Sequence, residues 1–208
     1  MKEIAKNLLK IKAVSLSPEA PFTWASGIKS PIYCDNRLVL SYPQARATVI
    51  QEMIRVIKEQ FPDCESLMGT ATAGIPHASI CAWEMGLATG YIRGKAKDHG
   101  KGNQIEGHYY PGMKVVVVED LISTGGSSLQ AVEAAKEAGC EVLGLVAIFT
   151  YNLDKAKKAF ADAGVKYYAL SNYEELVEVA VAENYIEEKS LQKLQKFQKN
   201  PSDMSWME

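Results

Sequence analysis

The stretch VVVVEDLISTGGSS, residues 115–128, decides the fold of this chain. Its four consecutive valines are β-branched, so they predict a strand buried on both faces, as in a parallel sheet covered by helices. A helical pattern follows from Ser127, and Gly139 is the residue expected to end that helix in a left-handed conformation. A buried strand joined by a glycine turn to a helix is the repeating unit of an α/β fold.

The rest of the chain continues this alternation of strands and helices. Ser41 is expected to cap a helix that has Pro43 in its first turn, and the polar, lysine-rich residues 187–208 are expected to form a surface helix that frays into a tail. The sequence predicts a right-handed α/β fold of one domain, residues 1–208, in which helices flank a mainly parallel sheet. The further expected helices cover residues 1–12, 43–60, 75–86, 154–163 and 173–183, and the further expected strands begin at residues 66, 87, 142 and 165.

The composition excludes several classes of protein. A net charge of −2 provides no general attraction for nucleic acid, so an anionic ligand has to be held by local features. The longest uncharged apolar runs, such as residues 142–149, are too short to cross a bilayer, and the N-terminus lacks the apolar core of a signal peptide. The four cysteines have no CxxC spacing, which indicates neither a zinc site nor a disulfide framework. We therefore expect a cytoplasmic protein that binds neither nucleic acid nor membranes.

The turn after the buried strand has the chemistry of a phosphate site. Backbone N–H groups at a helix N-terminus attract anions, and Gly125 and Gly126 let the backbone approach closely. The stretch is not a P-loop, because a P-loop has a lysine after its glycines and none stands here. It is not a dinucleotide fingerprint either, because the acid of that motif follows the glycines, whereas these acids precede them. Glu119 and Asp120 beside a phosphate cradle suit a phosphorylated sugar, because the sugar hydroxyls can donate hydrogen bonds to the carboxylates. The alternative is an ordinary strand–turn–helix corner in which both acids are solvated. Hydroxyl donors are expected at Ser123, Thr124, Ser127 and Ser128.

These residues resemble the phosphoribosyl-diphosphate (PRPP) signature of the type I phosphoribosyltransferases. The match covers VVVVEDLISTGGS and is specific for that superfamily, but it does not identify the base. The resemblance implies the type I phosphoribosyltransferase fold, with a small N-terminal hood and a flexible loop. It also implies PRPP contacts at Glu119, Asp120, Leu121, Ile122, Ser123, Thr124, Gly125, Gly126 and Ser127.

The stretch YIRGKAKDHGKGNQIEG, residues 91–107, is rich in glycines and cations. It predicts a mobile loop with an anionic ligand such as a diphosphate; a solvated hairpin tip is the plainer alternative. The pattern R-x-x-x-K-D-H-G resembles the catalytic loop of orotate phosphoribosyltransferases, here residues 93–107. Gly94 stands where some members have a second basic residue, so that contact is not carried over. The resemblance places the catalytic, diphosphate-contacting residues at Arg93, Lys97 and His99, with Asp98 beside them.

A second stretch, FTWASGIKSPIYCDNR at residues 22–37, narrows the choice of base. The pattern F-T-x-x-S-G-x-x-S-P resembles the N-terminal, orotate-side segment of the same family, about residues 1–40; aromatic residues that only pack in the core are the alternative. Ser123 matches a position that touches orotate, and Arg37 is our candidate for binding the orotate carboxylate. Contacts made elsewhere in the family are not carried over to three departing positions: Ala25, Ala73 and Tyr151.

The resemblance implies transfer of ribose 5-phosphate from PRPP to orotate, giving orotidine 5′-monophosphate and diphosphate in de novo pyrimidine (UMP) biosynthesis. It also implies Mg²⁺ bound through the substrate diphosphate, without a firm protein ligand, and a homodimer that shares the loop between subunits. A purine phosphoribosyltransferase and a PRPP-sensing regulatory protein are the competing hypotheses. Trp83 and the methionines are expected to pack in the core, and His77 and His108 to be hydrogen-bonded structural residues.

Overall fold

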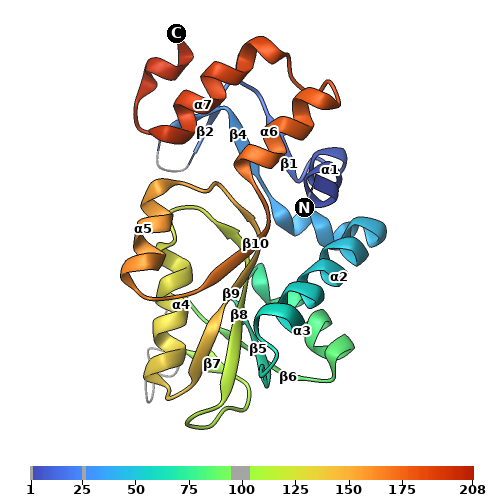
Figure 1. Cartoon of the computed structure of the whole chain (residues 1–208), viewed down its shortest axis with the longest axis vertical. Helices are drawn as coiled ribbons and strands as arrows, with labels where there is room; N and C mark the ends of the chain where they lie inside the picture. The colour runs from blue at the N-terminus through green and yellow to red at the C-terminus, as the bar shows by residue number, and fades with distance from the viewer. Residues whose placement is uncertain (1, 25–26, 95–103) are drawn as a thin grey trace.

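The computed structural model describes residues 2–24, 27–94 and 104–208, and it has an α/β architecture (Figure 1). The described residues form a central six-stranded sheet in the order β10-β9-β8-β5-β6-β7, in which only β7 is antiparallel to its neighbour. The predicted fold class, a mainly parallel sheet flanked by helices, is confirmed. The strands are β5 (Ser66–Thr70), β6 (Ala88–Ile92), β7 (Ile105–Glu106), β8 (Lys114–Ile122), β9 (Glu141–Thr150) and β10 (Tyr167–Asn172).

Strand β8 is the strand predicted from the four valines, and its side chains alternate between two cores. Val116 and Val118 are fully buried in one apolar cluster, and Val115 and Val117 are fully buried in the other. Residues of α2 and α3 fill the first cluster, and residues of α4 and α5 fill the second, so helices cover both faces of the sheet (Figure 1). None of the helices described for this chain has the length and apolar character needed to span a membrane. The bounds are α2 (Pro43–Gln60), α3 (Gly74–Met85), α4 (Gly126–Glu137) and α5 (Asp154–Asp162).

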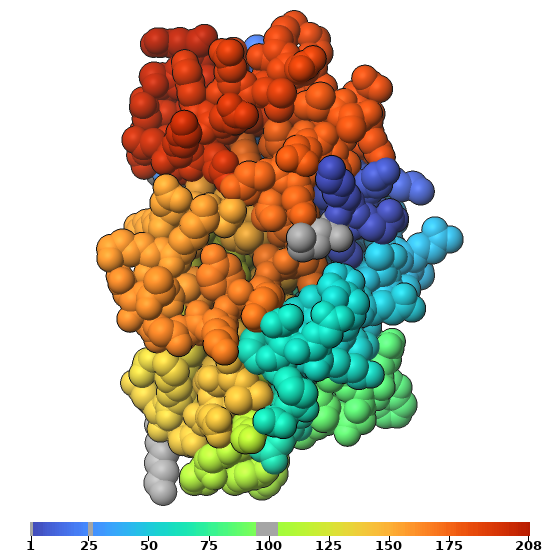
Figure 2. Space-filling view, in the orientation of Figure 1, coloured from blue at the N-terminus to red at the C-terminus, as the bar shows by residue number. Residues whose placement is uncertain are grey.

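A hood stands at one end of the sheet and combines the first and last segments of the chain (Figure 1). Its two small sheets pair β1 with β4 and β2 with β3, all antiparallel. The space-filling view shows the C-terminal residues, in red, forming one end of the molecule above the blue N-terminal residues (Figure 2). The hood is built from α1 (Lys2–Lys10), β1 (Val14–Leu16), β2 (Phe22–Thr23), β3 (Lys29–Ser30), β4 (Ile32–Cys34), α6 (Tyr173–Ala182) and α7 (Leu191–Lys199).

The helix expected within residues 187–208 is present as α7, but the prediction that it frays into a tail is wrong, because the residues after it are folded. After η2 (Glu188–Ser190) and α7, a short 3-10 helix, η3 (Met204–Met207), carries Trp206 into the core, where it is 1% exposed. The Trp206 ring packs edge-on against Phe197, with 5.5 Å between the ring centroids. The lysine-rich composition concealed the apolar face of α7, onto which the tryptophan closes.

Two predictions at helix ends had different outcomes. Gly139 follows α4 with a φ of 90°, which confirms the left-handed terminator. The prediction that Ser41 caps α2 is wrong, because Ser41 is the last residue of a 3-10 helix, η1 (Asn36–Ser41). The N-cap is Tyr42, which makes no side-chain capping bond, and Pro43 at the helix start lacks one of the N–H groups that would need a cap.

Single side chains also depart from the packing expected of them. The prediction for Trp83 is wrong, since this side chain is 87% exposed near the end of α3. His77 is fully buried, but neither ring nitrogen has a hydrogen-bond partner among the described residues, and burial lowers its pKa to about 4. Met68 lies in the core as expected, whereas Met204 is 45% exposed.

Candidate active site

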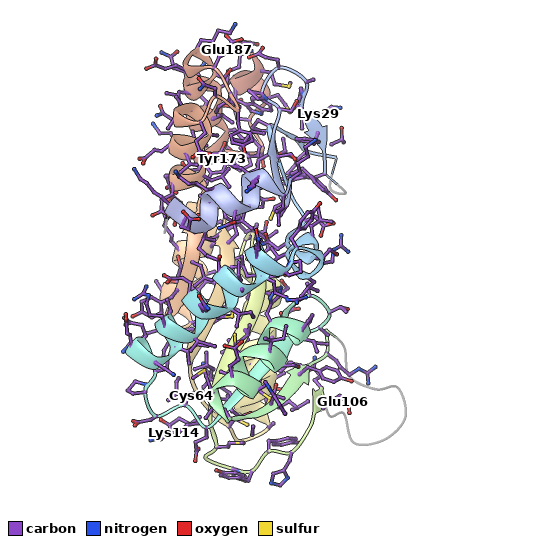
Figure 3. All side chains as sticks on the ribbon, turned by 90° about the vertical axis from the view of Figure 1, so that its right-hand side faces the viewer. Lys29, Cys64, Glu106, Lys114, Tyr173 and Glu187 are labelled. Carbon is purple, nitrogen blue, oxygen red and sulfur yellow. The ribbon has the colours of Figure 1, made fainter. Side chains whose placement is uncertain are left out.

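A cavity of about 370 Å³ lies at the carboxyl ends of β5, β6 and β8. Figure 3 shows Cys64 and Lys114 near the amino-terminal ends of β5 and β8, and Lys29 and Tyr173 in the hood at the opposite end of the molecule. The lining includes six of the predicted site residues: Arg93, Glu119, Asp120, Leu121, Ser123 and Ser127. It also includes residues that the sequence did not single out as ligand contacts: Thr70, Ala71, Thr72, Ala73, Ile92, Gln104, Gln130 and Ala131.

Glu119 borders this cavity but is only 7% exposed, so it is not the solvated acid of the plainer hypothesis. Its Oε1 accepts hydrogen bonds from Thr70 Oγ1 at 2.6 Å and from the Asp120 N–H at 3.0 Å. Its Oε2 accepts a hydrogen bond from Ser128 Oγ at 3.1 Å. Burial raises the pKa of Glu119 to about 7, although the Thr70 hydrogen bond acts in the opposite direction. The protein therefore holds the Glu119 carboxyl group tightly, whereas the neighbouring Asp120 is half-buried.

Thr70 and Ser128 hold Glu119, and the sequence did not reveal this role. Ser128 was expected to donate to a phosphate, which is wrong: it is 1% exposed, and its hydroxyl points inward to Glu119. Thr70 ends β5, and its hydroxyl also lies 3.3 Å from the Val118 carbonyl of the adjacent strand β8. Only the strand order brings Thr70 beside Glu119, and that order cannot be read from the local pattern of either strand.

The glycine turn forms the start of α4. Gly125 is the N-cap residue, with a φ of 83°, and a Cβ at this position would lie 3.1 Å from the Phe160 ring. Gly126 has open space around its Cα, with nothing within 4 Å of an added Cβ. The turn leaves the first N–H groups of the helix available for an anion. Ile122 is fully buried, so its side chain belongs to the core rather than to the cavity.

The floor of the cavity is the small-residue turn between β5 and α3. It contains a cis peptide bond between Ala71 and Thr72. Gly74 starts α3 and packs against the Val118 carbonyl, and a Cβ at Gly74 would also lie 2.6 Å from Thr70 Oγ1. Glycine at this position therefore allows the turn to approach β8 and keeps the Thr70 hydroxyl near Glu119.

The rim of the cavity carries Arg93, directly after β6. Its guanidinium Nη1 lies 3.7 Å from Glu106 Oε1, and its backbone exchanges hydrogen bonds with Gln104. Lys97, Asp98 and His99, the other predicted catalytic residues, lie outside the described residues, so the loop prediction over residues 93–107 remains a prediction. The parts of the chain that the structure describes contain no group of three or more His, Cys, Asp or Glu residues able to hold a metal ion.

A second cavity, of about 200 Å³, adjoins the first and shares two of its lining residues, Leu121 and Ser123. Its other lining residues are Trp24, Tyr33, Cys34 and Tyr151. The Trp24 and Tyr151 rings lie 5.4 Å apart and are tilted by 31°, and the Trp24 Nε1–H donates to the Ile32 carbonyl at 3.2 Å. Burial raises the pKa of the Cys34 thiol, as does the nearby Asp120 carboxylate, so the thiol is neutral. The cavity is an aromatic slot suited to a flat ring.

No lysine or arginine is among the described residues that line this aromatic slot. Arg37, the candidate for an orotate carboxylate, lines neither cavity and pairs with Asp35, with Nε–Oδ1 and Nη2–Oδ2 distances of 2.6 and 2.9 Å. This ion pair raises the pKa of Arg37 and lowers that of Asp35. Ala25 lies outside the described residues, Ala73 lines the larger cavity, and Tyr151 lines the slot.

The chain is similar to known proteins over nearly its full length. The phosphoribosyl transferase domain family matches residues 44–184. An orotate phosphoribosyltransferase of Streptococcus thermophilus is 60% identical over 198 residues, which cover 95% of each chain. One of Streptococcus pneumoniae is 58% identical over 207 residues, which cover 100% of this chain and 98% of the relative.

A solved structure agrees with these relatives. The crystal structure of orotate phosphoribosyltransferase from Aeropyrum pernix superimposes with a TM-score of 0.75 and 27% identity, covering 84% of this chain and 96% of that chain. The family resemblance drawn from the PRPP signature, the cationic loop and the N-terminal segment is confirmed. The chain belongs to the phosphoribosyl transferase domain family and, within it, to the orotate phosphoribosyltransferases.

Proposed function

We propose that this chain transfers ribose 5-phosphate from PRPP to N1 of orotate through the two adjoining cavities. The observation that carries the proposal is their contrast: one is lined by two carboxylates and by Ser127 at the start of α4, the other by aromatic rings, and they meet at Leu121 and Ser123. Transfer of a sugar phosphate to a flat base needs a polar environment for the sugar phosphate on one side of the reacting carbon and an aromatic environment for the base on the other. The bond from C1′ to the diphosphate breaks, and the bond from C1′ to N1 of orotate forms.

The larger cavity suits the sugar phosphate. The N–H groups of Gly125, Gly126 and Ser127 at the start of α4 would bind the 5′-phosphate, assisted by the Thr124 hydroxyl. The Asp120 carboxylate would accept hydrogen bonds from the ribose hydroxyls, while Glu119 contributes negative charge close to the sugar. That charge favours the positive character that C1′ acquires as the diphosphate leaves.

The aromatic slot suits orotate. The base would stack against the aromatic side chains that line the slot, with Ser123 as its hydrogen-bonding neighbour. Arg37 would bind the orotate carboxylate, and to do so its guanidinium would leave its ion pair with Asp35. The Arg37 side chain is 66% exposed and can move, whereas Asp35, at 22% exposure, would keep a hydrogen bond from the Arg37 backbone N–H.

The leaving diphosphate would be stabilised by Arg93 at the cavity rim and by the loop residues Lys97 and His99, with Asp98 beside them. Mg²⁺ carried on the diphosphate would neutralise its charge and orient it. The chemistry of the cavity fits this ion, because Asp120 offers oxygen donors and Mg²⁺ in such sites needs only one or two carboxylates besides the substrate phosphates. Closure of the loop would exclude water from the reacting carbon.

Three further proposals concern the whole molecule. Residues 1–208 act as one phosphoribosyltransferase domain, and two copies form a homodimer in which the loop over residues 93–107 reaches the neighbouring site. The cytoplasm is the proposed location, supported by four cysteines that are all free thiols.

The reaction is tested by measuring diphosphate release from PRPP with and without orotate, in Mg²⁺ and then in EDTA. We expect release only with orotate and Mg²⁺ together. Release with adenine or hypoxanthine in place of orotate would refute the assignment of the base. The shared loop is tested by mixing two inactive variants, Lys97→Ala and Asp120→Asn, since a site built from two subunits regains activity in the mixed dimer.

A further inference from the structure

Asn36 joins the hood to β8 through one buried hydrogen bond. Its side chain is 1% exposed, and its Nδ2 donates to the backbone carbonyl of Asp120 at 2.7 Å. The two residues are 84 positions apart in the sequence. Asn36 begins η1, two residues after the last residue of the hood strand β4, whereas Asp120 lies near the end of β8.

The Asp120 carbonyl needs this partner because β5 ends before it. The last pair between β5 and β8 is Gly69 with Val118, and the Val118 carbonyl lies 3.3 Å from the Thr70 hydroxyl, so it points toward β5. Carbonyl groups alternate in direction along a strand, so the Asp120 carbonyl, two residues later, points to the same side. No β5 residue pairs with β8 there, and the Asn36 amide takes the place of the missing strand.

The other end of the amide supports a specific role for the donor. Asn36 Oδ1 is buried and has no hydrogen-bond partner among the residues that the structure describes. An unpaired buried acceptor is unfavourable, so the fold tolerates a cost in order to keep the N–H donor at this position.

The segment that carries Asn36 also lines the aromatic slot. Tyr33 and Cys34, just before Asn36, border the slot, whereas Asp120 borders the larger cavity. We propose that Asn36 is a positioning residue that couples the two cavities. It holds the Asp120 backbone in register with the hood, so that a base in the slot favours a sugar phosphate in the larger cavity, and the reverse. This inference rests on the proposed function, which assigns the base and the sugar phosphate to these cavities.

The coupling follows from how β8 is held. Beyond Val118, the sheet holds β8 only through its pairs with β9. The Asp120 backbone is also held by Glu119 Oε1 at its N–H and by the Asn36 amide at its carbonyl. Of these two residues Asn36 is the one joined to the hood, so a small movement of the hood onto a bound base is passed to the Asp120 backbone through Asn36. Each ligand then pre-orders part of the site that the other one uses.

The test uses orotate and ribose 5-phosphate, a pair that cannot react because ribose 5-phosphate carries no diphosphate leaving group. Calorimetry on the full chain gives the Kd of orotate without and with saturating ribose 5-phosphate. For the wild type we expect the sugar phosphate to tighten orotate binding about 5-fold or more. For Asn36→Ala and Asn36→Asp we expect a ratio close to one, since aspartate keeps the shape of asparagine but lacks the N–H donor.

Ser30→Ala is the matched control. Ser30 is fully buried in the same segment, but its hydroxyl donates within that segment, to the Ile32 carbonyl at 2.8 Å. This variant should keep the wild-type ratio. A wild-type ratio of one, full coupling in Asn36→Asp, or an equal loss in Ser30→Ala would each overturn the proposal. Failure of the proposed function is recognised separately, as a wild-type chain that does not release diphosphate in the presence of orotate.

Discussion

Replacing Glu119 by glutamine should stabilise the folded chain at neutral and alkaline pH while it slows the reaction. Glu119 is 7% exposed, and burial raises its pKa from 4.5 to about 7. A carboxyl group whose pKa is raised on folding adds stability that is fully present below about pH 4.5 and is lost as the pH rises through about 7. A shift of this size corresponds to about 3 kcal/mol in the free energy of unfolding.

Glutamine has the same shape but stays neutral, so Glu119→Gln does not undergo this loss. Its carbonyl oxygen can accept from Thr70 and the Asp120 N–H, and its amide can donate to Ser128. Urea unfolding of both proteins across this pH range measures the effect. The stability of the variant relative to the wild type should grow by about 3 kcal/mol between about pH 4.5 and about pH 8. The rate with PRPP should fall, because the negative charge beside C1′ is lost.

Glu65→Gln provides a control of opposite sign. Glu65 Oε2 accepts a hydrogen bond from the Lys114 N–H at 2.7 Å, which lowers its pKa below 4.5. Its contribution is present above about pH 4.5 and is lost as the pH falls, so this variant should be less stable than the wild type at neutral pH. If the difference between Glu119→Gln and the wild type did not change with pH, the argument from burial would be refuted.

Four other substitutions have definite expected outcomes. Lys97→Ala should lower kcat about 10²-fold or more without changing the melting temperature, and turnover near wild type would exclude the loop from catalysis. Trp206→Ala should cost about 3–5 kcal/mol in urea unfolding. The Phe197 ring lies 5.5 Å from the Trp206 ring and 5.8 Å from the Trp24 ring, measured between centroids, so it connects the two tryptophans. Trp206→Ala should therefore also raise KM for orotate more than KM for PRPP. Gly74→Ala should cost about 1–3 kcal/mol and lower the rate, because the methyl group displaces Thr70 from Glu119, whereas Gly126→Ala should leave stability almost unchanged.

The sequence predicted most of the sheet because its buried strands carry local signals. The valines of β8 mark it as buried on both faces, and Gly139 marks the end of α4. The order of the strands has no such local signal, so the contact of Thr70 with Glu119 could not be predicted. Trp206 was missed for a similar reason, since a single tryptophan in a polar tail says nothing of the distant surface that receives it.

The sequence named candidate site residues, but it did not predict the burial or the hydrogen-bond partners of each residue. Glu119 and Asp120 are adjacent in the sequence, yet the first is buried in hydrogen bonds and the second is half-buried. Arg37 was selected for its charge, but its pairing with Asp35 depends on the course of the backbone into η1. Asn36 lies between Asp35 and Arg37, and nothing in the sequence indicated its role, because its hydrogen-bond partner is a backbone carbonyl 84 positions away.

The burial of Trp206 also sets the order in which the chain can become stable during its synthesis. The hood segments α1 and β1–β4 leave the ribosome before the strands of the central sheet, whereas α6, α7 and Trp206, which complete the core of the hood, are made after those strands. The sheet strands between them can pair in the meantime, since a chain generally folds its N-terminal parts during synthesis. Until α7 emerges, Trp24 lacks its contact with Phe197, and the growing chain exposes apolar surface that chaperones recognise. A chain that stops before Trp206 would therefore have a paired sheet with an unfinished base site.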